Sequence, residues 1–123
     1  MSKITKYKIS ATIAAGATAA SAYSVPIRGK VLAVGVDYPS HVCTVDLDTD
    51  GEASAQKILD LASASTDATY YPRTSSQDNA GADVTFDGTN EIYEPFVVYG
   101  RVKLSVAAGT ALDSVSVYLM VEE

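Results

Sequence analysis

The chain has 123 residues, of which 47% are hydrophobic and 20% charged, and its formal net charge is −6. This composition is typical of one globular domain and excludes a disordered chain, and no apolar run approaches the roughly 18 residues of a membrane-spanning helix. The acidic balance argues against nucleic acid as the main partner, because phosphate binding needs a basic face. The single cysteine, Cys43, cannot form an internal disulfide, which is compatible with folding in a reducing cytoplasm.

The charges are distributed unevenly along the chain. Residues 1–36 carry five bases and no acid, whereas residues 37–123 carry fifteen acids and four bases, so the two parts hold +5 and −11. Such asymmetry is an argument about association. We treat 1–123 as a single β domain with 1–22 as a candidate N-terminal arm, whose Lys3, Lys6 and Lys8 would dock on an acidic surface. The alternative is a solvated strand face that is rich in lysine.

The N-terminus imitates a secretory signal, with lysines followed by an Ala/Ile stretch and the small-residue triplet Ala20-Ser21-Ala22. Polar residues and a glycine interrupt the stretch, namely Ser10, Thr12, Gly16 and Thr18. We therefore expect a retained segment and not a cleaved signal.

Period-two alternation of apolar and polar residues recurs along the chain and predicts half-buried strands. The expected strands, in chain order, lie at about 6–13, 30–38, 42–47, 96–106 and 114–121. In the first, the lysines should face outward, and in the fourth, Gly100 indicates a bulge or a close backbone approach. Residues 14–22 fit a short helix or an Ala-rich loop, and residues 55–62 fit a helix or a strand, with the strand favoured.

Turn residues separate the expected strands. They are Arg28-Gly29, Tyr38-Pro39-Ser40, Asp50-Gly51, Asn79-Ala80-Gly81, Asp87-Gly88 and Ala108-Gly109. The sequence therefore predicts an all-β fold, either a β-sandwich or a jelly-roll-like barrel of about eight short antiparallel strands, with an extended N-terminal arm.

Three alternating acids precede a glycine in DLDTDG, namely Asp46, Asp48 and Asp50 before Gly51. This spacing opens a calcium-binding loop, where oxygen ligands converge and glycine permits the sharp turn. The twelfth position of such a loop needs a bidentate Glu, but here it is Lys57. The alternative is a strand end whose acids face water, so Ca²⁺ is at most a weak candidate and no other cofactor is expected.

Catalytic motifs are scarce. His41 and Cys43 lie on one face of an extended chain, as an activated Cys-His pair would, but the sequence offers no third group to orient the histidine. The alternative is a small buried cysteine near an incidental histidine. No GxSxG, HExxH, CxxC or P-loop spacing is present. We expect no enzymatic activity.

Tyr70-Tyr71-Pro72-Arg73 is a dense cluster of candidate interface residues. Pro72 cannot donate to a central ladder and biases Tyr71 toward an extended conformation, which predicts an edge strand or a strand end. Tyr and Arg are enriched at interface hot spots, so Tyr70, Tyr71 and Arg73 are candidate anchors. The alternative places one tyrosine in the core and Arg73 in a local ion pair.

Three stretches, together with SVPIRGKVLAV at 24–34, carry a resemblance to a group of small tailed-bacteriophage virion proteins. They are ILDLASASTDATYYPR at 58–73, DNAGADVTFDGTNEIYEP at 78–95 and VVYGRVKLSVAAGT at 97–110. The Ala-rich N-terminal piece departs from the group. The resemblance implies assembly, and not catalysis.

From this resemblance we expect a capsid decoration or cement protein that stabilises the head by protein–protein contacts. Its partners would be the major capsid protein and its own copies, as a trimer, with no nucleic acid and no membrane. It would lie on the capsid surface of the virion after assembly in the host cytoplasm. The alternatives are a head-fibre base, a tail or adaptor subunit, and a carbohydrate-binding adhesive β module.

Overall fold

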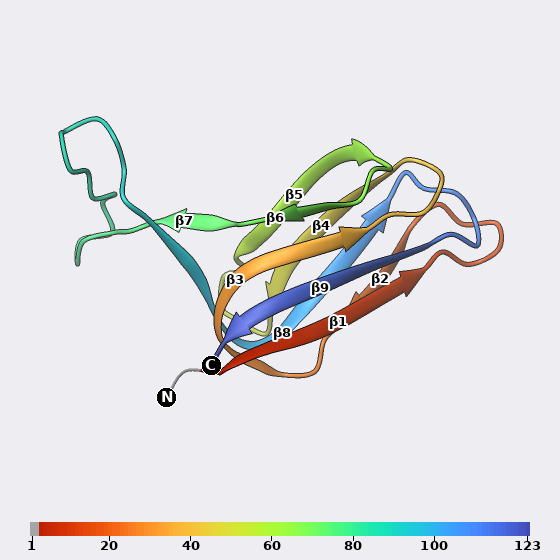
Figure 1. The fold of residues 1–123 in the computed structure, drawn as a ribbon, viewed down its shortest axis with the longest axis horizontal. Coiled ribbons are helices and arrows are strands. Elements are labelled where there is room, and N and C mark those ends of the chain that lie inside the picture. Colours follow the sequence, from red (N-terminus) through yellow and green to blue (C-terminus); the bar gives the residue numbers. More distant parts are fainter. Residues whose placement is uncertain (1–2) are drawn as a thin grey trace.

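A computed structural model describes residues 3–123, which form nine β-strands and no helix. The strands, coloured along the chain in Figure 1, are β1 (Ile4–Thr12), β2 (Ala20–Tyr23), β3 (Ile27–Asp37), β4 (Cys43–Asp50), β5 (Lys57–Ala64), β6 (Ala68–Tyr70), β7 (Arg73–Ser75), β8 (Tyr93–Ala107) and β9 (Ser114–Glu122). All their pairings are antiparallel. The predicted all-β sandwich is confirmed.

The strands follow the hydrogen-bonded order β1-β9-β3-β8-β4-β5. The first layer contains β1, β9 and β3, the second contains β4 and β5, and the long strand β8 connects the two. Its first part, Phe96 to Gly100, pairs with β3, and its second part, Arg101 to Ala107, pairs with β4. The short strands complete the layers, because β6 pairs with β3 and β2 with β8. Gly100 stands where β8 changes partners, with φ +134°, which is a conformation that glycine adopts without steric cost.

The hydrophobic core lies between the layers and follows the alternation in the sequence. In β9, Val115, Val117, Leu119 and Val121 are buried, while the residues between them are not. The largest fully buried side chains include Leu47 of β4 and Leu104 of β8. Burial of such residues stabilises the fold by about 25 cal/mol per Å² of apolar surface.

The expectation of an extended N-terminal arm is wrong. Ile4–Thr12 form β1, which pairs along its whole length with β9, from Ile4 opposite Glu122 to Thr12 opposite Ser114. Its inward residues, such as Ile9 and Ala11, are buried in the core. The physical reason is the alternation itself, since this apolar face gains more by joining the core than by remaining extended in water.

Two ambiguous segments are resolved. Residues 14–19 form a loop that leads into β2, and no part of 14–22 is helical. Lys57–Ala64 form the strand β5, as favoured, with Ile58 and Leu59 both buried beside an irregularity in its pairing with β4. Five of the six predicted turns lie outside strands or at a strand end.

The turn predicted at Arg28-Gly29 is wrong, because Gly29 lies inside β3. It has φ +141°, and a Cβ at this position would collide with the carbonyl oxygen of Glu122. The glycine therefore permits a close approach of β3 to β9 and does not reverse the chain.

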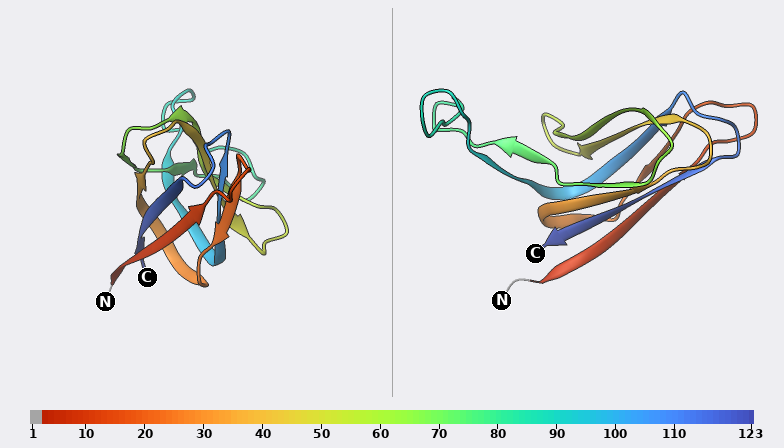
Figure 2. Two further views of the ribbon diagram at one scale, coloured as in Figure 1. Left: turned by 90° about the vertical axis from the view of Figure 1, so that its right-hand side faces the viewer. Right: turned by 45° about the horizontal axis from the view of Figure 1, so that its top comes forward.

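Residues 74–94, which we call the projecting hairpin, extend beyond one end of the sandwich (Figures 1 and 2). At its base, β7 pairs with the start of β8, where Ser75 lies opposite Tyr93. Farther out, isolated bridges join Gln77 with Asp83 and Thr85 with Glu91, and backbone hydrogen bonds join Ser76 to Val84 and Ile92 at 2.9 and 2.8 Å. None of its residues is buried, so the hairpin lacks a core of its own.

Candidate interaction surfaces

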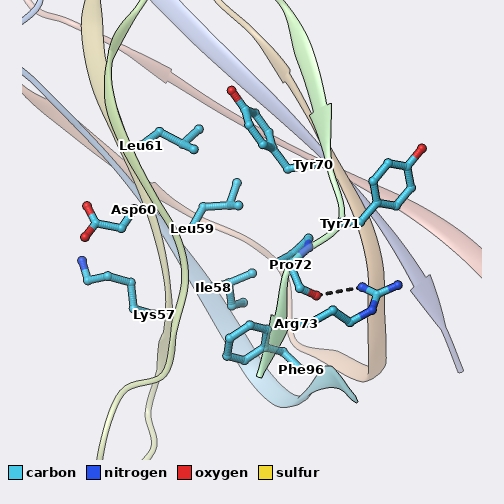
Figure 3. Close-up of a pocket in the computed structure, with 10 residues that line it drawn as sticks. All are labelled: Lys57, Ile58, Leu59, Asp60, Leu61, Tyr70, Tyr71, Pro72, Arg73 and Phe96. Atoms are coloured by element: carbon cyan, nitrogen blue, oxygen red, sulfur yellow. Dashed lines mark hydrogen bonds between the residues drawn. The ribbon is translucent and has the colours of Figure 1, made fainter. Parts of the chain in front are cut away.

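An open groove of about 460 Å³ lies between β5 and the segment that connects β6 to β7. Figure 3 shows this groove with the side chains that surround it. The predicted anchors Tyr70, Tyr71 and Arg73 all line it, and the connection falls at strand ends, as Pro72 predicted. The other lining residues are Lys57, Ile58, Leu59, Asp60, Leu61, Pro72 and Phe96.

The predicted anchors differ in their surroundings. Tyr70 is half-buried against the core, whereas Tyr71 is 68% exposed. Arg73 forms no ion pair within residues 3–123. Its Nη1 instead donates to the carbonyl oxygens of Pro72 at 2.7 Å and Leu32 at 3.1 Å. Arg73 thus anchors the segment that connects β6 to β7 to the strand β3. Tyr71 is the most exposed aromatic side chain of the groove.

The lysines of β1 point outward, as their alternation predicted. The Nζ atoms of Lys6 and Lys8 lie 5.3 and 5.6 Å from the centroid of the Tyr118 ring on β9, within the range of a cation–π contact. Lys3 is exposed before β1, and its carbonyl oxygen accepts a hydrogen bond from the Glu123 amide at 2.8 Å. The lysines therefore belong to a sheet face and not to a free arm.

The outward face of the layer formed by β1, β9 and β3 carries several positive charges, and we call it the basic face. Besides Lys6 and Lys8, it includes Arg28 and Lys30 of β3, which lie opposite Tyr99 and Val97 of β8. The Arg28 guanidinium lies 5.1 Å from the Tyr99 ring centroid. Tyr99 and Val97 are 71% and 59% exposed. The face thus combines cations with uncovered apolar groups.

The projecting hairpin carries the opposite charge. It contains five acids, Asp78, Asp83, Asp87, Glu91 and Glu94, and no Lys or Arg. Hydrogen bonds from the backbone amides of Asn90 and Thr89 lower the pKa of Asp87, which keeps this carboxylate ionised at neutral pH. Phe86, Ile92 and Tyr93 are exposed on the same hairpin, with Phe86 at 71%.

Sequence reasoning missed these three hairpin residues as candidates. The available signal was an apolar or aromatic residue standing between turn-forming acids, as in the TFDG stretch around Phe86. Such a residue has no alternating apolar neighbours with which to build a buried face. Its exposure could have been predicted on that ground.

The DLDTDG acids lie along β4 and do not form a calcium loop. Asp46 and Asp48 approach the Lys57 ammonium at 3.8 and 3.6 Å, and Asp50 binds the Arg101 guanidinium at 2.6 Å. Partial burial raises the pKa of Asp46, while Lys57 opposes that shift. A strand directs alternate side chains along a row, so the three carboxylates do not converge on one point.

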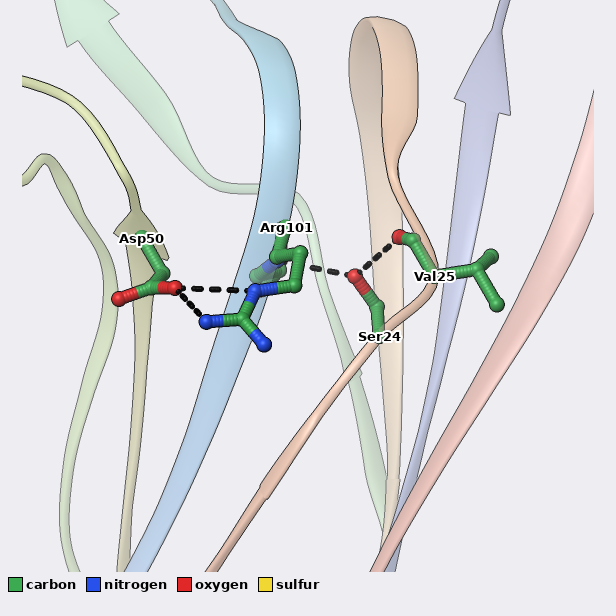
Figure 4. A network of polar contacts seen from close by, with 5 residues as sticks. Ser24, Val25, Asp50 and Arg101 are labelled. Carbon is green, nitrogen blue, oxygen red and sulfur yellow. Dashed lines mark hydrogen bonds and ion pairs between the residues drawn. The ribbon is translucent and has the colours of Figure 1, made fainter.

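The Asp50–Arg101 pair belongs to a polar network on the outer side of the second layer (Figure 4). The Arg101 guanidinium also lies 4.3 Å from the centroid of the Tyr23 ring at the end of β2. The Ser24 hydroxyl donates to the carbonyl of Val25 at 2.7 Å and accepts from the amide of Val102 at 2.9 Å. These contacts fix the end of β2 to β8, which is a structural role.

His41 and Cys43 do not form a catalytic pair. The exposed His41 directs Nδ1 to the Asp113 carboxylate at 2.8 Å, while Cys43 is buried in the core. Burial, and then the nearby charge of Asp113, raises the pKa of the Cys43 thiol, which is opposite to thiolate activation. Among the residues described, no three or more His, Cys, Asp or Glu side chains are grouped to hold a metal ion.

No protein-family model matches the chain, and no curated protein shows significant similarity to it. Between residues 3 and 123 there is also no helix long and apolar enough to span a membrane.

Proposed function

We propose that this chain is a bacteriophage virion structural protein that decorates or cements the capsid through protein–protein contacts. The observation that carries the proposal is the projecting hairpin, which exposes Phe86, Ile92 and Tyr93 and has no buried residue. Exposed apolar groups on a segment without its own core are typical of a surface that docks on a partner. The resemblance of residues 24–110 to small tailed-phage virion proteins supplies the class of partner.

The mechanism is burial of contact area on the major capsid protein and between copies of the chain. A shell offers repeated symmetric sites, and a closed cyclic oligomer such as a trimer fits them. The wide sandwich would supply the rigid body, and the hairpin and the lysines of β1 would supply contacts. No step in this mechanism forms or breaks a covalent bond, so neither a catalytic residue nor a cofactor is required.

The sharpest test is occupancy of purified heads of the phage that encodes the chain, measured by co-sedimentation with heads that lack it. We expect saturable binding that a Phe86→Ser, Tyr93→Ser variant reduces by on the order of tenfold or more. Leu112→Ser is the matched control, because Leu112 is also 71% exposed but lies between β8 and β9. Heads that never bind the chain would contradict the proposal.

The lysines are tested separately. A Lys3, Lys6 and Lys8→Glu variant should occupy heads less at physiological salt, because reversal of three charges removes attraction to an acidic neighbour. Normal occupancy by this variant would exclude these residues from the mechanism while leaving the hairpin contact intact. Location by electron microscopy of whole virions would distinguish the capsid surface from a head-fibre base, a tail or an adaptor position.

A carbohydrate-binding adhesive module is the second candidate, and the groove favours it. Tyr70 and Tyr71 line an open cleft beside the charged groups of Asp60 and Arg73, and aromatic faces with polar neighbours are suited to sugar rings. Glycan-array binding that Tyr71→Ala abolishes would support this candidate. Head binding without glycan binding would exclude it.

A further inference from the structure

We infer that the projecting hairpin of one copy docks on the basic face of a second copy, so that copies associate head to tail. This inference deepens the proposed function by naming the surfaces that join neighbouring copies. It concerns the protein in solution and can be tested without a capsid. Three features of the molecule support it: unpaired opposite charges, exposed apolar groups and the separation of the two surfaces.

The acidic side chains of the hairpin have no cationic partner within residues 3–123. The acids that accept hydrogen bonds accept them from neutral donors. Asp78 accepts from the amides of Ala80 and Ala82, Asp87 from those of Thr89 and Asn90, and Glu91 from the Ser75 hydroxyl. These bonds order the turns but leave the negative charge uncompensated.

The four bases of the basic face are likewise without an ion pair in the part of the chain described. The cation–π contacts of Lys6, Lys8 and Arg28 orient the charges and do not neutralise them. Two acids lie on the same outward face, Glu122 opposite Lys30 and Asp37 at the other end of β3. The face therefore keeps an excess of positive charge, opposite in sign to the charge of the hairpin, and such complementarity steers and orients association.

Apolar groups accompany the charges on both surfaces. The hairpin exposes Phe86 and Tyr93, and the basic face exposes Ile4, Val97 and Tyr99 at 63%, 59% and 71%. Aromatic residues and arginine are the residues that most often contribute binding energy at the centre of an interface. Attraction between charges would set the orientation, and burial of these groups would supply the affinity.

The two surfaces lie in different places on one molecule. The hairpin tip extends beyond the ends of β1 and β9 in Figure 1 and in the right-hand view of Figure 2. A contact between two different patches is heterologous, and it generates a ring when the rotation between copies closes. Head-to-tail docking therefore provides a physical route to a cyclic oligomer, which fits the repeated symmetric sites of a shell.

The test is sedimentation velocity of the full chain over a range of concentrations. We expect reversible association that weakens at about 0.5 M salt, where the Debye length falls to about 4 Å. Asp83→Lys with Glu94→Lys should raise the dissociation constant on the order of tenfold or more, and Lys6→Glu with Lys30→Glu should do the same. A chain that carries all four reversals should associate again, because the two surfaces are then complementary with exchanged signs.

Asp60→Lys is the matched control, since it changes one exposed charge of β5, outside both surfaces, and should leave association unchanged. Circular dichroism verifies that each variant is folded. If a reversal variant unfolds, Asp83→Asn with Glu94→Gln tests the same contact with smaller changes. Phe86→Ser should also weaken association, and at high salt its effect should persist.

A chain that remains monomeric at every concentration would overturn the inference, as would an oligomer that none of these substitutions weakens. The proposed function fails by a different result, which is absence of binding to heads. A monomer that binds heads would thus overturn only the head-to-tail contact. An oligomer that does not bind heads would overturn only the decoration role.

Discussion

The sandwich and the projecting hairpin are both built from antiparallel β structure, but they are stabilised in different ways. The sandwich buries complete apolar faces of β3, β8 and β9 between two layers. The hairpin relies on isolated bridges and on acids that accept backbone hydrogen bonds, and it leaves its apolar residues in water. The comparison indicates that one region maintains the fold while the other is available for contacts.

The largest expected contrast is between two large apolar residues, one from each region. Leu104→Ala removes a fully buried side chain of β8 and should lower the free energy of unfolding by about 2–5 kcal/mol. Phe86→Ala in the hairpin should change it by no more than about 0.5 kcal/mol. Urea denaturation followed by circular dichroism measures both at low protein concentration. A loss of similar size for Phe86 would show that the hairpin packs on the sandwich.

Two glycines with positive φ, Gly29 in the sandwich and Gly88 in the hairpin, compare how the two regions tolerate an added Cβ. Gly29→Ala forces a Cβ against the backbone of β9 at a positive φ, and should destabilise the sandwich by about 3 kcal/mol. Gly88 in the hairpin also has positive φ, but nothing lies within 4 Å of its added Cβ. Gly88→Ala should therefore strain only the local turn. Thermal unfolding that is lowered equally by both substitutions would contradict this view.

A buried hydroxyl gives a smaller effect with a defined pH dependence. Burial, and then the neighbouring Tyr70, raises the pKa of Tyr38 to about 12 from its ordinary 10.0. Its hydroxyl has no hydrogen-bond partner within residues 3–123, so Tyr38→Phe should stabilise the fold by about 1 kcal/mol at neutral pH. Because the unfolded chain ionises first, the stability that the protonated Tyr38 provides is complete below pH 10 and is lost as the pH rises toward 12.

The measurement compares denaturation curves of wild type and variant from neutral pH to pH 12. The advantage of Tyr38→Phe should grow above pH 10, because phenylalanine does not titrate. Tyr93→Phe is the control, since Tyr93 is an exposed hairpin residue at 61% and should show no such growth. A constant difference at all pH values would refute the role assigned to burial of Tyr38.

The same contrast explains what the sequence could predict. Strict alternation in residues 114–122 identifies both the strand and its buried face, because a buried face has a period of two. Pro72 correctly placed its cluster at a strand end, since proline lacks the amide that a central ladder needs. Where local physics determines the structure, the sequence was sufficient.

The failures have one physical cause, which is dependence on partners that are distant in the chain. The local sequence around Gly29 predicts a turn, but a glycine is needed there because the carbonyl oxygen of Glu122 leaves no room for a Cβ. The lysines of β1 predict a basic arm when the local sequence is considered alone, but the pairing of β1 with β9 places them on a sheet face. The basic face joins residues of β1, β3 and β8, and no local pattern indicates that they share a surface.

The smallest expected effect lies at the tip of the hairpin and concerns local order only. Hydrogen bonds from the amides of Asn90 and Thr89 lower the pKa of Asp87 below its ordinary 3.8. A lowered folded-state pKa contributes stability that is present above 3.8 and is lost as the pH falls through the folded value. Acidification below 3.8 should therefore reduce the protection of these two amides relative to their intrinsic exchange rates, as measured by NMR, without exposing the amides of β9. Asp87→Asn should remove this dependence on pH, and simultaneous loss of β9 protection would show that hairpin and sandwich open as one unit.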